Sequence, residues 1–202
     1  MTRVETGKGV QEYDPAWDDD LDGDKMPERL QDLLEEPATM ETVEPLSVLD
    51  VASAILKLKG PLDTYQLQKL CYYAQAQHVA FYNTRLFREP IEAWPNGPVI
   101  RELYRRHAGK RRIEALSDGD PLKVEAQPAA ADTVTAVLKE YGDFTGPQLV
   151  EMTHREQPWR DARRTLRPKQ PSRAEIPVEA LRDYYQGFDD IEPVDEDSVK
   201  SP

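Results

Sequence analysis

The sequence has a single cysteine, Cys71, among its 202 residues. One cysteine excludes an intramolecular disulfide and any metal site built from cysteines alone. Long apolar runs are also missing. The longest apolar-rich stretch, residues 48–58, is broken by Asp50, Ser53 and Lys57, whereas a membrane-spanning helix needs about 20 apolar residues. The N-terminus is acidic and has no apolar segment typical of a secretory signal. These absences together predict a cytoplasmic protein.

Histidine is also scarce, with only His78, His107 and His154 in the chain. None of them belongs to an HExxH pair, and no phosphate-binding glycine loop, GxSxG frame or EF-hand pattern is present. Cys71 and His78 lie seven residues apart on one predicted helix, about 10.5 Å of rise, which is too far for direct activation of a thiol. The sequence therefore predicts no catalytic residue, no cofactor and no metal. Cys71 is expected in the core, and an approach of His107 or His154 to it is the remaining alternative.

Positive charge is rare at both ends of the chain. Residues 1–44 hold 14 acidic and 4 basic side chains, and residues 189–202 hold 6 acidic and 1 basic. Residues 45–188 are nearly balanced, with 18 acidic and 21 basic side chains. Segments so acidic and so poor in apolar residues cannot offset the entropy of ordering. We therefore expect one domain over residues 45–188, flanked by acidic, disordered tails.

One part of the N-terminal segment departs from this pattern. Residues 27–36, PERLQDLLEE, begin with a proline suited to a helix start and place Leu30, Leu33 and Leu34 on one helical face. This piece is predicted either to fold as a short helix against a partner or to remain a solvated segment.

The domain is predicted to be mainly α, a compact multi-helix fold. Ser47 suits the N-cap of a helix that ends before Gly60, and Asp63 with Gln66 resembles a capping box at the start of a second helix. Further helices are expected over residues 98–107, 129–141, 146–155, 158–166 and 177–186. The core-facing stripe of the second helix is predicted to be Leu67, Leu70, Cys71, Ala74, His78 and Phe81.

A proline-rich region interrupts the helices. Residues 86–94 are too short and too proline-marked for a helix, and Phe87 and Ile91 around a Glu-Pro pair predict a small two-stranded excursion. The following segment, 91–100, reads IEAWPNGPVI. Its Asn-Gly pair is typical of a hairpin turn, but Pro98 cannot donate to a returning strand and suits a first helical turn. A strand-to-helix corner anchored in the core by Trp94 is therefore predicted.

Two basic groups could contact phosphates. They are Arg101, Arg105, Arg106, Lys110, Arg111 and Arg112, and then Arg160, Arg163, Arg164, Arg167 and Lys169. The small net charge of the domain and the acidic tails argue against unassisted nucleic-acid binding. The groups are expected to be solvated helix faces paired with acids, or to bind an acidic protein surface or the chain's own tails.

Three stretches together carry a family resemblance. The first is LQKLCYYAQ at residues 67–75. The second comprises Leu86-Phe87, IEAW at 91–94 and Gly97-Pro98-Val99. The third comprises Tyr141-Gly142, Leu149 and THREQPW at 153–159. In this order and spacing they resemble the Panacea-domain proteins, also called SocA-like or GepA-like. The resemblance covers about residues 47–187 and does not include the acidic segment 1–44.

The resemblance implies a small helical domain from bacterial or prophage toxin–antitoxin operons that neutralises a toxin by binding it directly. One family member is an adaptor that delivers its toxin to a AAA+ protease, and the family motifs carry no established catalysis. The chain is therefore expected to be an antitoxin that is not an enzyme and whose partner is a cognate toxin. The alternatives are a proteolytic adaptor and a hydrolase that uses Cys71 or His154.

The sequence predicts a set of toxin-contact residues and a set of structural residues. Tyrosine and arginine are frequent in interface hot spots, and a rigid corner loses little entropy on binding. The predicted toxin-contact residues are Pro95, Asn96, Arg101, Tyr104 and Arg105 in the domain, with Leu30, Leu33 and Leu34 in the acidic segment. The predicted structural residues are Trp94, Gly97, Pro98, His154 and Trp159.

Overall fold

In the computed structural model of the protein, residues 44–187 are described. Their elements are α2 (Val48–Lys59), β1 (Leu62–Asp63), α3 (Thr64–Tyr82), β2 (Ile91–Trp94), β3 (Gly97–Ile100), α4 (Arg101–His107), β4 (Arg112–Ile113), α5 (Pro121–Glu125), α6 (Pro128–Tyr141), α7 (Gly146–Arg155), α8 (Gln157–Ala162) and α9 (Val178–Gln186). The mainly helical fold with a small two-stranded sheet is confirmed. The predicted tails, and Leu30, Leu33 and Leu34 with them, lie outside the described residues.

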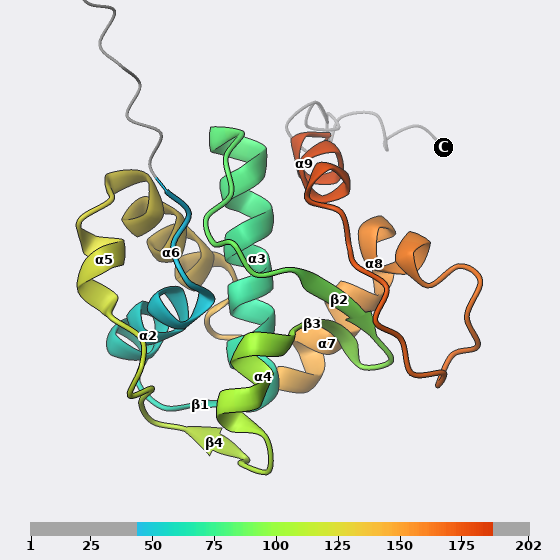
Figure 1. Ribbon diagram of the computed structural model, residues 1–202, viewed down its shortest axis with the longest axis horizontal. Helices are drawn as coiled ribbons and strands as arrows, with labels where there is room; N and C mark the ends of the chain where they lie inside the picture. Colours follow the sequence, from blue (N-terminus) through green and yellow to red (C-terminus); the bar gives the residue numbers. More distant parts are fainter. Residues whose placement is uncertain (1–43, 188–202) are drawn as a thin grey trace, which may run out of the picture. The chain divides into compact units, whose positions relative to one another are not determined.

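Helix α3 is the centre of the described region. Figure 1 shows α2, α5 and α6 on one side of it, and the β2–β3 pair with α7 and α8 on the other. The capping box predicted at its start is present: the Asp63 side chain accepts hydrogen bonds from the backbone of Tyr65 and Gln66, and the Gln66 side chain caps the Asp63 backbone in return. Asn83, with a positive φ of 56°, ends the helix.

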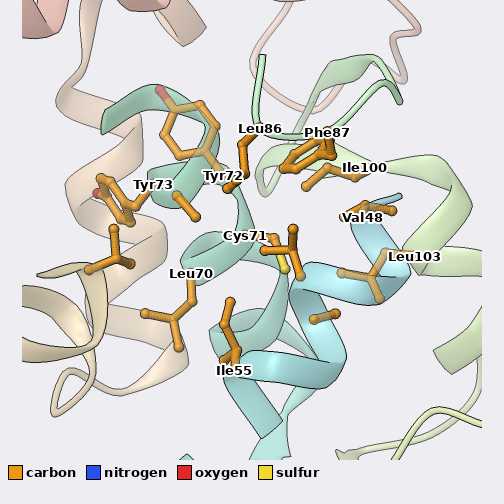
Figure 2. Packing of buried hydrophobic residues seen from close by; sticks show 14 of the residues in the cluster. Val48, Ile55, Leu70, Cys71, Tyr72, Tyr73, Leu86, Phe87, Ile100 and Leu103 are labelled. Atoms are coloured by element: carbon orange, nitrogen blue, oxygen red, sulfur yellow. The ribbon is translucent and has the colours of Figure 1, made fainter. Parts of the chain in front are cut away.

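The core is made where α3 meets its neighbours. Figure 2 shows Cys71 of α3 among apolar side chains that include Val48 and Ile55 of α2 and Leu103 of α4. Cys71 is fully buried, and burial raises the pKa of its thiol well above the ordinary value. Its predicted role as a small core residue is confirmed.

The predicted core stripe of α3 is wrong at its last position. Phe81 is 80% exposed, whereas Val79, two residues earlier, is buried. The reason is geometric. In the last turn of α3 the buried residues are His78, which contacts Thr133 of α6, and Val79, whereas Phe81 lies at the edge of this face, where the packing against α6 leaves its ring in solvent.

The segment 91–100 is a β-hairpin, so the predicted strand-to-helix corner is wrong. Strands β2 and β3 pair antiparallel from Trp94–Gly97 at the turn to Ile91–Ile100 at the open end. Pro95 and Asn96 form the turn, where the fixed φ of proline suits the first position. The excursion predicted around Phe87 is therefore displaced: its strands begin at Ile91, after the Glu-Pro pair.

Pro98 is tolerated in the second strand because of its place in the ladder. It pairs with Ala93, whose backbone N–H points away from β3 and donates to the Ala174 carbonyl at 2.8 Å. At such a position of an antiparallel ladder the N–H groups face outward, so the missing donor of Pro98 breaks no hydrogen bond between the strands. Helix α4 accordingly starts at Arg101, three residues later than predicted.

The other helices match the predictions to different degrees. Helix α7 has the predicted bounds, α6 and α9 differ from theirs by one residue, and α8 ends four residues early at Ala162. Helix α5 and the short β1–β4 pair were not predicted. Among residues 44–187, no helix is long and apolar enough to cross a membrane.

Candidate functional site

A buried lysine of α3 donates hydrogen bonds to the hairpin. Lys69 on α3 is 1% exposed, and its Nζ donates to the carbonyls of Asn96 and Pro98 at 2.9 and 2.8 Å. Gly97 lies between these carbonyls with a φ of 96°. A Cβ on Gly97 would lie 2.8 Å from Lys69 Nζ and 2.9 Å from the Oγ1 of Thr153, so both the φ and the close approach require glycine. Burial lowers the pKa of Lys69 to about 7, and the negative charge of Glu156 opposes this shift.

Two glutamines of α3 bind the chain that leads into and out of the hairpin. The Gln68 side chain accepts from the Ile100 N–H at 2.9 Å and donates to the Ile100 carbonyl at 3.2 Å. The Gln75 side chain accepts from the N–H groups of Leu86 and Phe87 and donates to the Phe87 carbonyl. Since each buried backbone group needs a partner, the first motif stretch satisfies the backbone of the second.

The third motif stretch adds a buried carboxylate. Glu156, at the junction of α7 and α8, accepts hydrogen bonds from the hydroxyls of Tyr72 and Tyr73 at 2.6 and 2.8 Å. The ring of Tyr73 stacks on Tyr141 with 4.0 Å between centroids. Burial raises the pKa of Glu156, and the hydrogen bonds from the tyrosines and the charge of Lys69 act in the opposite direction.

The predicted structural residues of the third stretch reach the hairpin. Trp159 Nε1 donates to the Trp94 carbonyl at 3.0 Å, and its ring stacks on His154 at 4.2 Å. Burial lowers the pKa of His154, and the charges of Lys69 and Arg163 lower it further. Neither His107, which contacts Gln68, nor His154 is therefore engaged with Cys71.

Arg163 completes the support of the hairpin. The guanidinium of this buried residue donates to the Ala93 carbonyl at 2.8 Å. It also donates to the carbonyls of the loop that follows α8, those of Arg167, Pro168 and Gln170. The basic group around residue 163 is thus not uniformly solvated, because this member is a buried structural cation.

A groove opens beside the hairpin, which we call the hairpin groove. Its volume is about 550 Å³. Three aromatic and three basic side chains belong to its lining, which comprises Asp63, Thr64, Tyr65, Gln68, Lys69, Trp94, Asn96, Val99, Tyr104, His107, Ala108, Gly109, Lys110, Arg111 and Pro147. The only acid among them, Asp63, is occupied in capping α3. The exposed cations Lys110 and Arg111 outnumber this one carboxylate, so the groove carries a small positive charge.

Trp94 lies in this groove and not in the core, which corrects the prediction. Its ring is half-buried, contacts the Tyr104 ring at 5.0 Å between centroids, and has Arg101 above it at 5.7 Å. Its Nε1 donates to Glu92 at 2.7 Å. The side chains of β2 alternate in direction, so the buried Ala93 faces inward and Trp94 lies toward the surface.

The predicted contact residues of the domain lie around the hairpin groove, although not all of them line it. Asn96 and Tyr104 do, and Pro95 lies in the turn next to them. Arg101 forms an ion pair with Glu92, and Arg105 forms one with Glu102 at 2.7 Å. Both arginines are thus held on the surface of α4 next to the groove.

A second groove, the tyrosine groove, lies between α3, α6, α7 and α9 and was not predicted. Its volume is about 560 Å³. It is lined by Tyr73, Gln77, Ala80, Phe81, Tyr82, Asp132, Thr133, Ala136, Glu140, Tyr141, Met152, Glu156, Tyr184 and Tyr185. Its charged lining residues are all acidic. Among the described residues, no group of histidine, cysteine and carboxylate side chains suited to hold a metal is found.

Comparison with known proteins identifies the central part of this arrangement. Residues 67–160 match the family model described as antitoxin SocA-like, Panacea domain. The matched range contains all three motif stretches, and it excludes α2 and α9. The resemblance inferred from the sequence is confirmed over this narrower range. No curated protein and no solved structure matched the chain.

Proposed function

Because residues 67–160 match the SocA-like Panacea domain model, we propose that the chain is an antitoxin that neutralises a co-encoded toxin by binding it directly. One observation supports binding above all. The polar side chains of the motif stretches bind the chain's own groups, with Lys69 on the hairpin carbonyls and Glu156 on two tyrosines. Groups held in this way build a rigid surface and are not poised to attack a substrate.

The hairpin groove is the proposed contact surface for the toxin. Tyr65 and Tyr104 expose 46% and 39% of their surface beside it, and tyrosine is enriched in interface hot spots. Hydrogen bonds from Lys69 and Arg163 to backbone carbonyls fix the conformation of the hairpin. The hairpin therefore loses little conformational entropy when a partner binds. Lys110 and Arg111 make the groove basic, which suits a toxin segment that carries carboxylates.

The test is complex formation with the toxin encoded beside this chain. The double variant Tyr65→Ala/Tyr104→Ala is expected to bind about 100-fold more weakly, because two hot-spot rings each contribute about 1–2 kcal/mol. The matched control is Leu58→Ala/Leu122→Ala, which removes two similarly exposed apolar side chains from α2 and α5, away from both grooves. Calorimetric titration measures both variants. Equal dissociation constants for the two double variants would reject this contact surface.

Growth rescue separates direct neutralisation from the alternatives. Folded Cys71→Ser and His154→Gln variants are expected to rescue cells that express the toxin, because neither side chain has a nucleophile–base arrangement. Loss of rescue with normal expression would favour a hydrolase. Rescue that disappears only in a host without its AAA+ proteases would favour an adaptor.

A further inference from the structure

The tyrosine groove combines aromatic walls with acidic charge. Tyr73 and Tyr141 are stacked in one wall, and Tyr184 and Tyr185 of α9 belong to the lining. Phe81, 80% exposed, stands at the rim. Aromatic faces attract cations through the negative face of the ring, most strongly when the cation leaves water.

The charges in the groove have one sign. Within residues 44–187, its ionisable lining residues other than tyrosine are Asp132, Glu140 and Glu156, and no lysine, arginine or histidine of this range lines it. Asp132 and Glu140 are exposed, whereas Glu156 is buried. A cation that enters thus passes two surface carboxylates and reaches a third in a less polar environment, where electrostatic attraction is stronger.

Glu156 retains capacity to bind a further donor. An ionised carboxylate offers about four acceptor positions. Tyr72 and Tyr73 occupy two of them, and Tyr185 donates a third hydrogen bond. Lys69 acts on Glu156 through space, but its ammonium is bound by the hairpin carbonyls. The carboxylate therefore has no directly paired cation among the described residues.

We propose that the tyrosine groove binds a basic side chain of the toxin, an arginine or lysine whose charged group reaches Glu156 between the tyrosine rings. The proposal rests on the proposed function, because it assigns this occupant to a toxin in complex. Charge complementarity selects the occupant. The exposed ring of Phe81 beside the opening provides the apolar contact that accompanies such an anchor in a protein interface.

The groove is tested first on the full chain alone, with acetyl-arginine methylamide as the probe. Acetyl-citrulline methylamide is the matched control, because it has nearly the same shape and no charge. Met152 lines the groove and provides a reporter, since its labelled methyl signal can be followed by NMR and assigned with Met152→Leu. The arginine probe is expected to shift this signal in a saturable way and to bind at least 10-fold more tightly than the citrulline probe. Equal binding of the two, or no shift, would overturn the proposal.

Carboxylate variants test which acidic side chains attract the arginine probe. Glu156→Gln keeps the shape and one of the two acceptor oxygens, while its amide N–H can donate to the hydroxyl of the other tyrosine. It is expected to weaken binding of the arginine probe about 10-fold. Because a substitution at the buried Glu156 can impair folding, the second variant is Asp132→Asn/Glu140→Gln at the exposed rim. It is expected to lower the affinity for the arginine probe about 3-fold. Leu122→Ala, exposed and outside the groove, should leave the affinity unchanged. Unchanged affinity in both carboxylate variants would contradict the assignment.

The toxin complex then tests the occupant. Glu156→Gln and Phe81→Ala are each expected to weaken toxin binding by about 10-fold, and the loss in Glu156→Gln should be absent when the anchoring toxin residue is replaced by glutamine. If the probe binds but both variants bind the toxin normally, the groove does not hold a toxin side chain, and the proposed function stands without it. If the wild-type chain does not bind the toxin, both proposals fail, whatever the probe does.

Discussion

The two grooves are alike in size and opposite in charge. The hairpin groove and the tyrosine groove measure about 550 and 560 Å³, and both are lined by residues of α3. Lys69, near the start of this helix, lines the first groove, whose other charged lining residues are Lys110, Arg111 and the capping Asp63. The second contains Glu156 and two further acids. The difference teaches that one helix with its motif partners can border two grooves of opposite charge, set by the exposed side chains that line them: Lys110 and Arg111 in the first, Asp132 and Glu140 in the second.

The grooves also differ in how they are held. Around the hairpin groove, side chains bind backbone carbonyls, as Lys69 and Arg163 do on the hairpin. Around the tyrosine groove, helices pack through rings and hydroxyls, as Tyr73 does on Tyr141 and Glu156. Damage to the hairpin should therefore affect one groove and spare the other.

The largest effect is expected from Arg163→Met. The change removes hydrogen bonds to the Ala93 carbonyl and to three carbonyls of the following loop, and it leaves these acceptors without their partner. Bonds to a charged group contribute about 1.5–3 kcal/mol each, with partial compensation by water, so a loss of about 3–4 kcal/mol is expected. Urea denaturation measures it. Arg160→Met, on the exposed surface of α8 just before Arg163, should change stability by less than about 0.5 kcal/mol. Similar losses in the two variants would contradict the structural role of Arg163.

Gly97→Ala comes next. The positive φ costs alanine about 1–2 kcal/mol, and the new Cβ would also press on Lys69 and Thr153. A total of about 2–3 kcal/mol is expected. Gly109→Ala is the matched control, because its φ of 80° carries the same type of penalty but nothing lies within 4 Å of the added Cβ. Its loss should be about 1 kcal/mol.

The same pair of glycine variants sharpens the comparison of the grooves. Gly97→Ala should weaken toxin contact at the hairpin groove while the arginine probe still binds the tyrosine groove. Equal unfolding free energies for the two variants would show that the close approach to Lys69 has no energetic weight.

A smaller effect is the pH dependence due to Lys69. Its pKa is lowered to about 7 in the folded chain, against an ordinary value of 10.5. Between these values the unfolded chain binds a proton on Lys69 that the folded chain does not, so stability rises with pH. From pH 7 to 8.5 the wild type should gain about 1.6 kcal/mol relative to Lys69→Met, which has no such proton. Denaturation at both pH values measures this gain, and identical pH slopes would contradict the burial of a neutral amine under the hairpin.

Local signals allowed much of the fold to be predicted. Ser47 and Asp63 cap α2 and α3 with side chains and backbone only three residues apart, so the sequence itself contains the interaction. The hairpin could not be predicted in this way. Its Pro98 is acceptable because it occupies a position of the ladder where no N–H is needed toward β2, and this register exists only once the two strands have paired. Helix α5 was missed although Asp120 and Pro121 are local start signals, because its five residues are too few to show a helical period.

The residues of the two grooves also differ in whether a local sequence signal could identify them. Asn96 and Tyr104 were placed at a contact surface because exposed polar and aromatic side chains near a turn are visible in the sequence. The buried charges Lys69, Glu156 and Arg163 were not recognised. Within their stretches they look like ordinary surface residues, and only the assembled fold encloses them. The one available signal was that α3 has no continuous polar face around Lys69, which predicts a helix buried on all sides.

The central claim is that the chain neutralises its toxin by holding it in a complex. The most direct test is a titration of purified toxin activity with increasing amounts of the full chain. The account predicts a linear fall to an end point at a fixed molar ratio, with toxin and chain recovered together and chemically unchanged. Complete and lasting inactivation by a small fraction of an equivalent, or a covalent change in the recovered toxin, would contradict it.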